Sequence, residues 1–309
     1  MELRQLAAIA AVADQGTFSA AADALGTVQS NVSAHVANLE RELGVTLFDR
    51  SAGRLTEEGE AVVARARRVM AEMEALLADV AAVRHDVSGS ARLGVIGTTG
   101  RWLAPLLLDA TAARYPGVRL AVVEGNTTVL ETLLLGGRLD LGVAQLPVKD
   151  DDLVATRLFD EDLVLVVPAE SELARRREIE LGELAGMPLL LPLPGTTLRE
   201  ELDAAVRPAG FELTPKAELD GVRLIASLTF EGHGPALLPA TAVPEFLRDR
   251  WASVAVRGLP RRQVGKVLRR RGLLSAPARA VAELLDELVA AELTAGRPGE
   301  RGLHPAGNS

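Results

Sequence analysis

The chain has 309 residues, of which 48% are apolar and 25% charged, so it can form two or more domains with large cores. Its formal net charge of −8 argues weakly against nucleic acid as a partner, and the lack of cysteine excludes disulfides, thiolate metal sites, cysteine nucleophiles and thiol-based redox sensing. The four histidines are scattered, so we expect no metal site. Charged residues interrupt every apolar run and the N-terminus is a poor signal peptide, so we expect a cytoplasmic protein without a membrane span.

Residues 1–55 are predicted to form short helices joined by tight turns. A helix is expected at 20–25 with Ser19 as its cap, and Thr27 is expected to cap the next, longer helix. Two short helices joined by a tight turn form a helix-turn-helix pattern. Residues 1–60, however, hold four arginines against nine acidic residues, a deficit that any DNA-binding interpretation has to explain.

The longer helix, residues 28–43, is predicted to carry its apolar side chains within one arc of about 80°. These side chains are Val28, Val32, Val36, Leu39 and Leu43. The opposite face holds mainly small and amide side chains: Ser30, Ser33, Ala34, Ala37, Asn38 and Arg41. Such side chains allow a helix to approach base edges in a major groove, and Gln29 at its start can reach a base or a phosphate. Small buried interfaces use the same residues, so this face alone leaves both alternatives open.

Residues 56–87 predict one long helix. Thr56 precedes three acidic residues, which favours a helix start. Apolar residues then recur at alternating spacings of four and three, as in a coiled coil. They are Val62, Ala66, Val69, Met73, Leu76, Val80, Val83 and Val87. We interpret this stripe as a homodimer contact, because no neighbouring segment of similar length could cover it; a helix covering its own domain's core is the alternative.

After a linker at 88–90, alternating strands and helices predict mostly parallel sheets covered on both faces. Strands are expected at 92–96, 118–124, 139–144, 163–167, 236–238 and 263–268. Helices are expected at 99–115, 126–136, 196–206, 222–230 and 278–293. Residues 294–309 have no apolar period and are predicted to be disordered.

A basic segment, residues 257–272, contains seven arginines or lysines in sixteen residues. Such a run is compatible with nucleic-acid binding. We favour a solvated edge or a contact between subunits.

Three stretches of the sequence resemble the N-terminal winged helix-turn-helix of LysR-type transcriptional regulators: MELRQL, TFSAAADALGTVQSNVSAHVANLERELGVTLFDR and GRLTEEGE. The resemblance covers about residues 1–68. It implies an all-α winged helix-turn-helix at 1–55, a long linker helix at 56–87, and an α/β effector domain at 91–293 with two lobes like those of periplasmic binding proteins. Lobe I is expected at about 91–160 and 265–293, and lobe II at about 161–264.

The resemblance also implies sequence-specific binding of double-stranded DNA. The residues expected near bases or phosphates are Thr27, Gln29, Ser30, Ser33, Asn38, Arg50 and Arg54. Val28 departs from the serine or threonine that the family often has, and Ala34 replaces a longer polar or basic side chain. The partners implied are DNA, a small-molecule effector and further copies of the chain, as a homodimer through 56–87 and a homotetramer. RNA polymerase is considered as another partner, and no cofactor is expected.

Two strand-to-helix junctions, residues 97–100 and 194–197, each place a glycine beside two threonines. Ligands bind at the carboxyl ends of strands in open α/β sheets, and helix N-termini favour anions, so we expect a polar, anionic effector between the lobes. The candidate residues are Thr98, Thr99, Gly100, Gln145, Thr196, Thr197 and His233, with Arg101 and Arg223 as countercharges. Simple helix capping is the alternative role for each threonine.

An enzyme and a solute-binding protein with the same α/β fold are the rival functions. The sequence has no GxSxG, GxGxxG or phosphate-loop motif, so we expect no catalytic activity. A solute-binding protein would need an export signal and would have no use for residues 1–87. A transcriptional regulator accounts for both halves of the chain.

Overall fold

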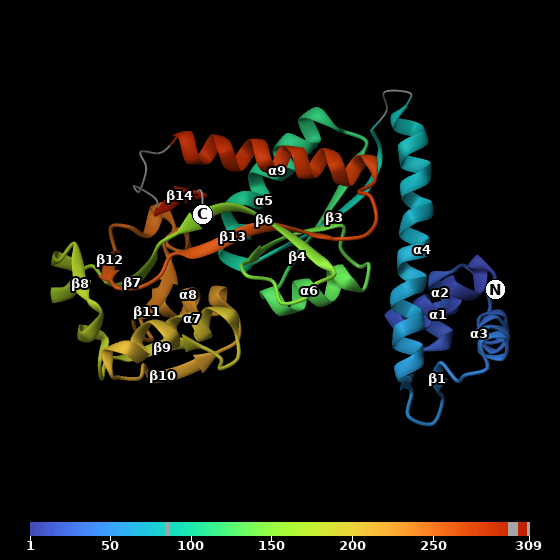
Figure 1. Ribbon diagram of the computed structural model, residues 1–309, viewed down its shortest axis with the longest axis horizontal. Coiled ribbons are helices and arrows are strands. Elements are labelled where there is room, and N and C mark those ends of the chain that lie inside the picture. Colours follow the sequence, from blue (N-terminus) through green and yellow to red (C-terminus); the bar gives the residue numbers. More distant parts are fainter. Residues whose placement is uncertain (84–86, 296–301, 308–309) are drawn as a thin grey trace.

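The computed structural model describes residues 1–83, 87–295 and 302–307. A small N-terminal domain leads through the long helix α4 to two α/β lobes (Figure 1). Within the described ranges, no helix is long and apolar enough to cross a membrane. The same ranges contain no group of three or more histidine, aspartate or glutamate side chains placed to hold a metal ion.

The N-terminal domain consists of three helices and a two-stranded wing. Its elements are α1 (Leu3–Gln15), α2 (Phe18–Ala24), α3 (Gln29–Leu43), β1 (Phe48–Asp49) and β2 (Arg54–Leu55). Apolar side chains from all three helices and the wing form one core, with Ile9, Val12, Val36, Leu39 and Leu47 almost fully buried. This arrangement confirms the predicted winged helix-turn-helix.

The predicted cap of α2 is wrong by two residues. The Thr17 hydroxyl accepts a hydrogen bond from the Ala20 N–H at 3.2 Å, so the helix starts at Phe18 instead of after Ser19. The Thr17 side chain thus satisfies a backbone N–H of the first turn. Ser19 lies inside the helix, so it is not in the N-cap position.

The predicted cap of α3 is also wrong. Val28 occupies the N-cap position, and the Thr27 hydroxyl accepts instead from the Asn31 side chain at 3.0 Å. Helix α3 therefore begins without a side-chain cap. The Asn31 N–H is bonded to the Val28 carbonyl, so the N–H groups of Gln29 and Ser30 are those left for an acceptor from outside the chain.

Helix α4 (Glu57–Ala82) starts as predicted, with the Thr56 hydroxyl accepting from the Gly59 N–H at 3.0 Å. A β-carbon on Gly59 would lie 2.0 Å from the carbonyl oxygen of Leu47, so a glycine is needed where the helix lies against the chain entering the wing. The helix ends at Ala82, earlier than the predicted residue 87. Residues 84–86 lie outside the described ranges.

The apolar heptad stripe of α4 is buried near the start of the helix and exposed further along it. Near its start, Ala66 is buried in the N-terminal domain. Further along, Val69, Met73, Leu76 and Val80 are between 42% and 63% exposed. The helix thus supports its own domain at one end and presents an uncovered apolar stripe along the rest.

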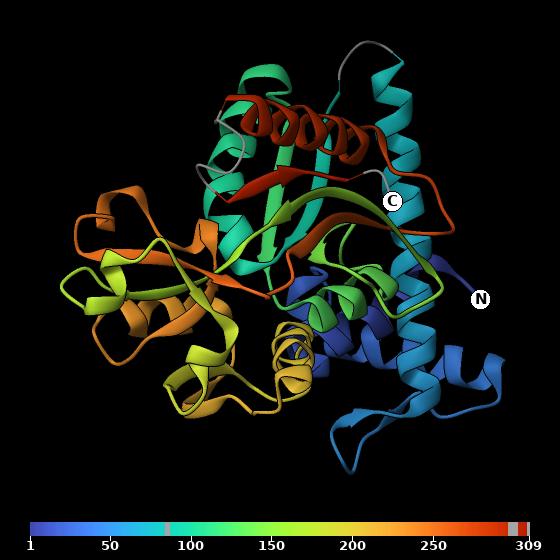
Figure 2. The same ribbon diagram turned by 60° about the vertical axis from the view of Figure 1, so that its left-hand side comes forward.

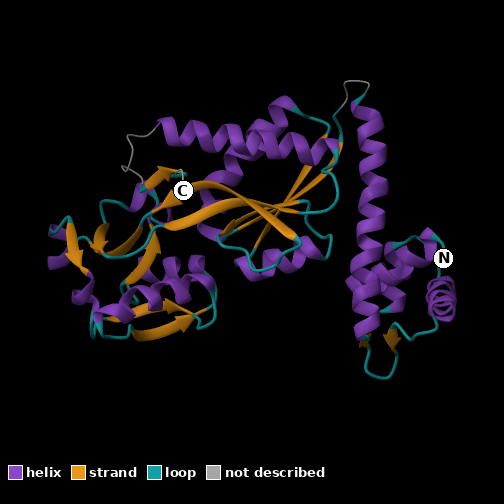
Figure 3. Ribbon diagram, viewed as in Figure 1, coloured by secondary structure: helices purple, strands orange, loops and turns teal. Residues whose placement is uncertain are grey.

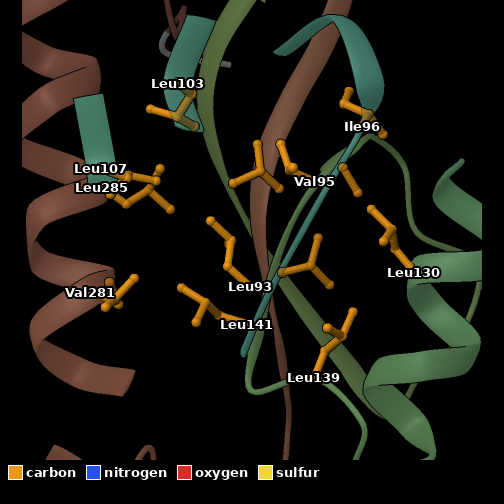
Figure 4. Close-up of a cluster of buried hydrophobic side chains, with 14 of the residues drawn as sticks. Leu93, Val95, Ile96, Leu103, Leu107, Leu130, Leu139, Leu141, Val281 and Leu285 are labelled. Carbon is orange, nitrogen blue, oxygen red and sulfur yellow. The ribbon is translucent and has the colours of Figure 1, made fainter. Parts of the chain in front are cut away.

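Lobe I is built on a six-stranded sheet with the strand order β14-β6-β13-β5-β3-β4. Its strands are β3 (Gly89–Val95), β4 (Val118–Glu124), β5 (Leu141–Gln145), β6 (Leu153–Glu161), β13 (Arg262–Arg269) and β14 (Leu303–Pro305). Its helices are α5 (Gly97–Arg114), α6 (Thr127–Leu135) and α9 (Ala276–Ala295). Leu107 and Leu285 from α5 and α9 pack on one face of the sheet, and Leu130 from α6 packs on the other (Figure 4).

Lobe II has a second six-stranded sheet, in the order β10-β9-β11-β7-β12-β8. Its strands are β7 (Leu163–Pro168), β8 (Glu178–Glu180), β9 (Pro188–Pro192), β10 (Thr214–Leu219), β11 (Ala236–Pro239) and β12 (Trp251–Arg257). It carries α7 (Thr197–Val206), α8 (Val222–Phe230) and the short 3-10 helices η1 (Glu172–Arg175), η2 (Leu181–Leu184), η3 (Arg207–Ala209), η4 (Ala240–Ala242) and η5 (Glu245–Leu247). Leu202 of α7 and Ile225 of α8 belong to separate cores of this lobe.

The chain crosses between the lobes twice, from β6 into β7 and from β12 into β13 (Figure 3). Because the chain must leave and return, β13 runs antiparallel to both β5 and β6, and β7 runs antiparallel to β11 and β12. The prediction of mostly parallel sheets is therefore wrong, because both sheets are mixed. Lobe I resumes at Arg262 instead of residue 265, because β13 starts there.

Helix α4 lies along lobe I in both views (Figures 1 and 2). Arg92 of β3 pairs with Glu74 of α4 at 2.9 Å. The Asp79 carboxylate accepts a hydrogen bond from the Ala276 N–H, at the start of α9, also at 2.9 Å. Polar contacts thus hold the linker helix against the effector domain, and Asp79 lies at the border between this contact and the exposed stripe.

The prediction of a disordered tail is wrong for residues 294–295, which end α9, and for residues 302–307. Strand β14 pairs antiparallel with the edge strand β6, with Leu303 opposite Glu161. The Asp162 N–H donates to the Gly302 carbonyl at 2.8 Å, and the Asp162 carboxylate lies 2.8 Å from His304 Nε2. A three-residue strand has no measurable apolar period, so the sequence pattern missed it. Residues 296–301 and 308–309 of the predicted tail lie outside the described ranges.

Ending the chain at Ala295 is expected to lower the melting temperature by about 2–4 °C, which corresponds to about 1–2 kcal/mol for a protein of this size. The truncation removes the ladder with β6, the burial of Leu303 and the His304 contact. Thermal denaturation followed by circular dichroism measures the effect. His304→Ala is the matched control: it keeps the ladder and should lose less than half as much. An unchanged melting temperature for the truncated chain would contradict a stabilising role for β14.

Candidate DNA interface and effector cleft

Helix α3 buries one side and exposes the polar side that the sequence predicted. Val32, Val36 and Leu39 are buried in the domain core. Gln29 and Ser30 are exposed. Ser33 and Asn38 are half-buried, and the Asn38 side chain accepts from Arg41 at 2.8 Å. The two ends of the predicted apolar arc, Val28 and Leu43, are 59% and 41% exposed, so the buried stripe is shorter than expected.

The wing is ordered by its own polar contacts. The Asp49 carboxylate accepts from the N–H groups of Ser51 and Ala52 at 2.8 and 3.0 Å. The Ser51 hydroxyl and these N–H groups lower the pKa of the Asp49 carboxyl. Arg50 lies over the Phe18 ring, 5.1 Å from its centre, and Arg54 is exposed on β2. Both arginines are thus at the surface beside the helix-turn-helix, where a phosphate backbone can reach them.

Part of the acidic excess of this domain serves its fold. The Glu40 carboxylate accepts from the N–H groups of Leu47 and Phe48, at 2.8 and 3.2 Å, and so holds the start of the wing on α3. Asp14 pairs with Arg67 of α4 at 2.6 Å. The Arg67 charge offsets that of Asp14, whereas Glu40 serves the fold but keeps its charge, so the objection raised by the charge count is weakened only slightly.

Between the two lobes lies a cleft of about 350 Å³. Lobe I contributes Ile96, Gly97, Thr98, Glu124, Gly125, Asn126, Thr127, Thr128, Val129, Gln145 and Arg262 to its wall. Lobe II contributes Pro192, Thr196, Thr197, Leu198, Asp220, Gly221, Val222 and Arg223. These residues include the N-terminal ends of four helices, α5, α6, α7 and α8. Helix N-termini carry partial positive charge and unpaired N–H groups, so the cleft is suited to a negatively charged group.

Arg262 is the most deeply buried cation of this cleft, at 2% exposure. Its Nη2 donates to the Thr98 hydroxyl at 3.0 Å and pairs with the fully buried Glu161. Glu161 stands at the crossing and also accepts from the Thr241 N–H of lobe II at 2.9 Å. Arg262 Nε, although buried, has no hydrogen-bond partner. The arginine is therefore fixed in place while one of its donors remains free.

Other polar contacts join the lobes around the cleft. Arg223 of α8 pairs with Glu124 of lobe I, and Arg101 of α5 donates to the Thr241 carbonyl of lobe II at 2.9 Å. Burial, with a smaller effect of the Arg223 charge, lowers the pKa of Arg101. Both arginines proposed as countercharges thus make contacts across the interlobe boundary.

The structure gathers four of the seven expected effector residues at the cleft wall: Thr98, Gln145, Thr196 and Thr197. The other three do not line it. Thr99 is fully buried behind Thr98, with its hydroxyl 3.5 Å from Arg262 Nη2. A β-carbon on Gly100 would lie 2.8 Å from Val95, so this glycine serves helix-to-strand packing. His233 is exposed, lies 3.7 Å from Glu231 and does not line the cleft.

The interpretation of residues 257–272 as a solvated edge holds for Arg257, Arg261, Arg270 and Arg271, which are exposed. It is wrong for β13, which lies inside the lobe I sheet between β6 and β5 and carries the buried Arg262. Several of the cations contact other parts of the chain. Arg257 pairs with Glu178 and Glu180, Lys266 pairs with Asp286, and Arg269 donates to the carbonyls of Leu134 and Leu139. Arg262, hidden in this run, was missed as a cleft residue. Its position at the first residue after the return crossing, beside the strand that ends at Gln145, is the signal that could have identified it.

Comparison with known proteins now decides the family. Residues 3–60 match the model of bacterial regulatory helix-turn-helix proteins of the lysR family, and residues 84–290 match the LysR substrate binding domain. The chain belongs to the LysR family. This LysR regulator is a DNA-binding transcriptional regulator with an effector-binding domain, as the sequence resemblance implied.

Similar proteins cover nearly the whole LysR chain. A probable hydrogen peroxide-inducible genes activator of Mycobacterium leprae is 34% identical over 93% of this chain and 94% of its own. The DNA-binding transcriptional dual regulator OxyR of Escherichia coli is 29% identical over 87% and 90%. Among solved structures, a full-length OxyR from Pseudomonas aeruginosa, in which a cysteine is replaced by aspartate, has a TM-score of 0.75, 26% identity and 94% coverage of both chains. Full-length CbnR in complex with its target DNA has a TM-score of 0.66, 25% identity, and coverage of 93% and 99%.

Proposed function

We propose that this LysR regulator reads DNA through α3 and the wing, and that a small anionic effector bound between the lobes controls it. The cleft is the observation that carries the effector part. Four helix N-termini and the buried Arg262 meet there, and the walls add the hydroxyls of Thr98, Thr127, Thr196 and Thr197. A site with many fixed donors favours a ligand rich in acceptors, such as a carboxylate.

A thermal-shift screen of the full chain with acetate, succinate, citrate and other small carboxylates tests the effector proposal. A ligand at 100 times its dissociation constant stabilises the folded state by about 2.7 kcal/mol, which raises the melting temperature by several degrees. The active compound should also change the affinity of the chain for DNA. If no carboxylate raises the melting temperature, the anionic-effector proposal is wrong.

The DNA contacts proposed for this chain are Gln29, Ser30, Ser33 and Asn38 of α3, Thr27 before it, and Arg50 and Arg54 of the wing. The uncapped start of α3 supports a phosphate contact, because its first N–H groups lack a side-chain partner. The exposed side chains of Gln29 and Ser30 stand at this end of the helix. Base reading by these residues and backbone contact by the wing would then follow from the same docking.

Arg54→Ala is expected to weaken DNA binding by a similar factor on all sequences and to reduce the slope of log affinity against log salt by about one. The exposed Arg54 can neutralise one phosphate, and a phosphate contact carries no sequence information. Fluorescence anisotropy of a labelled fragment at several salt concentrations measures the slope. Arg177→Ala, an exposed arginine of lobe II, is the control and should leave the slope unchanged.

We further propose a homodimer through α4. Its exposed stripe lines an apolar groove together with Leu273, which is 85% exposed. A second copy of the helix provides a stripe of equal length and heptad spacing. Pairing would link two DNA-binding domains and compensate for the few basic residues in each, and a homotetramer would extend the same gain.

Several relatives are named as hydrogen peroxide-inducible activators, whereas the signal proposed for this chain is a bound effector. Solved structures of OxyR from Pseudomonas aeruginosa and Corynebacterium glutamicum carry a substituted cysteine. This chain has no cysteine, and peroxide sensing through a thiol needs a thiolate that is oxidised to a sulfenic acid or a disulfide. A reversibly bound effector is therefore the signal that this cleft supports.

We infer a regulator acting in the cytoplasm, where its DNA partner is, and without catalytic activity. The polar residues of the cleft include no cysteine and no histidine, and its two arginines are paired with carboxylates. The winged helix-turn-helix weighs against a solute-binding protein.

A further inference from the structure

Three polar atoms near the cleft are buried without a hydrogen-bond partner. They are Arg262 Nε, Gln145 Nε2 and Glu201 Oε2. Arg262 and Gln145 are 2% and 4% exposed, and both line the cleft. Leaving such a group unpaired costs about 1–3 kcal/mol, so each is expected to meet a partner in some state of the protein.

The two donors come from neighbouring strands of lobe I. Gln145 stands opposite Val264 in the antiparallel β5–β13 pair, and Arg262 is two residues from Val264. Residues two apart in a strand share a face of the sheet, so Arg262 and Gln145 are diagonal neighbours that point the same way. Two such donors side by side suit the two oxygens of one carboxylate.

The third group faces them from lobe II. Glu201 lies one helical turn after the cleft residue Thr197, so the two share a face of α7. Burial raises the pKa of the Glu201 carboxyl, while the nearby Gln145 side chain and the Arg262 charge lower it, so Glu201 and Gln145 are near enough to meet each other when no ligand lies between them. A carboxyl whose pKa is raised accepts a hydrogen bond when ionised and donates one when protonated. A ligand hydroxyl can meet it in either state, because a hydroxyl both donates and accepts.

The charges in the cleft limit the ligand to one carboxylate. Arg262 is already paired with Glu161, and Arg223 with Glu124. Asp220 adds a further acid to the wall. A second carboxylate on the ligand would find no unpaired side-chain cation among the described residues of the wall, and a carboxylate without a hydroxyl would leave Glu201 unpaired.

We propose that the effector is a small hydroxy monocarboxylate, with its carboxylate on Arg262 and Gln145 and its hydroxyl on Glu201. This inference rests on the proposed function and names the ligand class of that site. Closure of the lobes on such a ligand would satisfy all three unpaired atoms at once. Ligand binding would thus favour one relative position of α7 and lobe I.

Titration calorimetry and thermal shift on the full chain test this ligand class. Each hydroxy acid is compared with the acid that lacks its hydroxyl groups. The pairs are glycolate with acetate, lactate and glycerate with propionate, mandelate with phenylacetate, and quinate with cyclohexanecarboxylate. At least one hydroxy acid should bind about 10- to 100-fold more tightly than its counterpart, as expected for a hydrogen bond to a charged group. Alanine tests a zwitterion, and succinate tests a dicarboxylate.

Glu201→Met should weaken the best hydroxy acid about 10- to 100-fold and its counterpart less than about twofold. Glu201→Gln, which keeps a polar group of the same shape, should recover part of the loss. Glu200→Met is the matched control: the neighbouring glutamate of α7 is exposed, so its loss leaves no buried group unpaired. It removes the interlobe pair with Lys149 at 3.5 Å, and any effect of that loss should fall equally on the hydroxy acid and its counterpart.

Each outcome decides the assignment. Equal losses for the hydroxy acid and its counterpart in Glu201→Met would overturn the role of Glu201. Tighter binding of succinate, alanine or a counterpart acid would overturn the ligand class while leaving an effector cleft in place. If no carboxylate binds at all, this inference and the anionic effector of the proposed function both fail.

Discussion

Leu76→Asp is expected to lower the affinity of the chain for DNA by about 10²- to 10⁴-fold while leaving its fold intact. Leu76 is 63% exposed at the centre of the α4 stripe, so the substitution removes no core packing. It places two aspartates against each other in the proposed helix pair. Loss of the pair separates the two DNA-binding domains, and the gain from their high effective concentration disappears.

Two measurements separate this effect from unfolding. Sedimentation equilibrium should show a monomer for Leu76→Asp. The variant should still unfold cooperatively, but its melting temperature should no longer depend on protein concentration. Ala82→Asp adds the same charge at the last residue of α4, outside the stripe, and should remain a dimer. A dimeric Leu76→Asp chain with normal DNA affinity would show that α4 does not join the subunits.

Arg262→Met is expected to destabilise the chain by about 3–5 kcal/mol. It leaves the fully buried Glu161 carboxylate without its cation and removes the donor to Thr98. Glu161 stands at the crossing between the lobes, so the lost pair also loosens the hinge. Chemical denaturation measures the loss.

A double-mutant cycle distinguishes the stability lost with the Arg262–Glu161 charge pair from the stability lost with the packing of the Arg262 side chain. Removing both charges, in Arg262→Met with Glu161→Gln, should recover more than half of the stability lost in Arg262→Met, because no uncompensated buried charge remains. It should not recover effector binding, since the Arg262 donor is still absent. Equal destabilisation of the single and the double variant would mean that the charge pair itself contributes little.

The regular parts of this fold were predictable from local pattern. Strand β4 and helix α8 begin and end at the predicted residues, because each has a clear apolar period bounded by turn residues. Strands β6, β8, β9, β10 and β12 were missed. Prolines interrupt the apolar pattern of β9 and β10. The pairing of β12 with β7 and β8 is set by distant strands that a local pattern cannot reveal.

The cleft was predictable only in part. The threonines at the α5 and α7 starts could be found, because a glycine followed by hydroxyls marks a strand-to-helix junction. Arg262 was not separated from the six other cations of its segment, because the strand was predicted to start one residue later, at 263, and a charge count does not show which cation is buried. Glu161 and Glu201 have no local signature at all. Their roles arise from contacts with residues about 60 to 100 positions away.

A DNase I footprint on the DNA flanking the gene of this chain tests the central claim most directly, namely that α3 reads DNA as part of a dimer. The account predicts two protected half-sites related by a dyad, with centres about 10 base pairs or a multiple apart. Ser33→Asp, which adds a negative charge to the reading face of α3, should remove both. Absence of any protected region, or protection that persists in Ser33→Asp, would contradict the account.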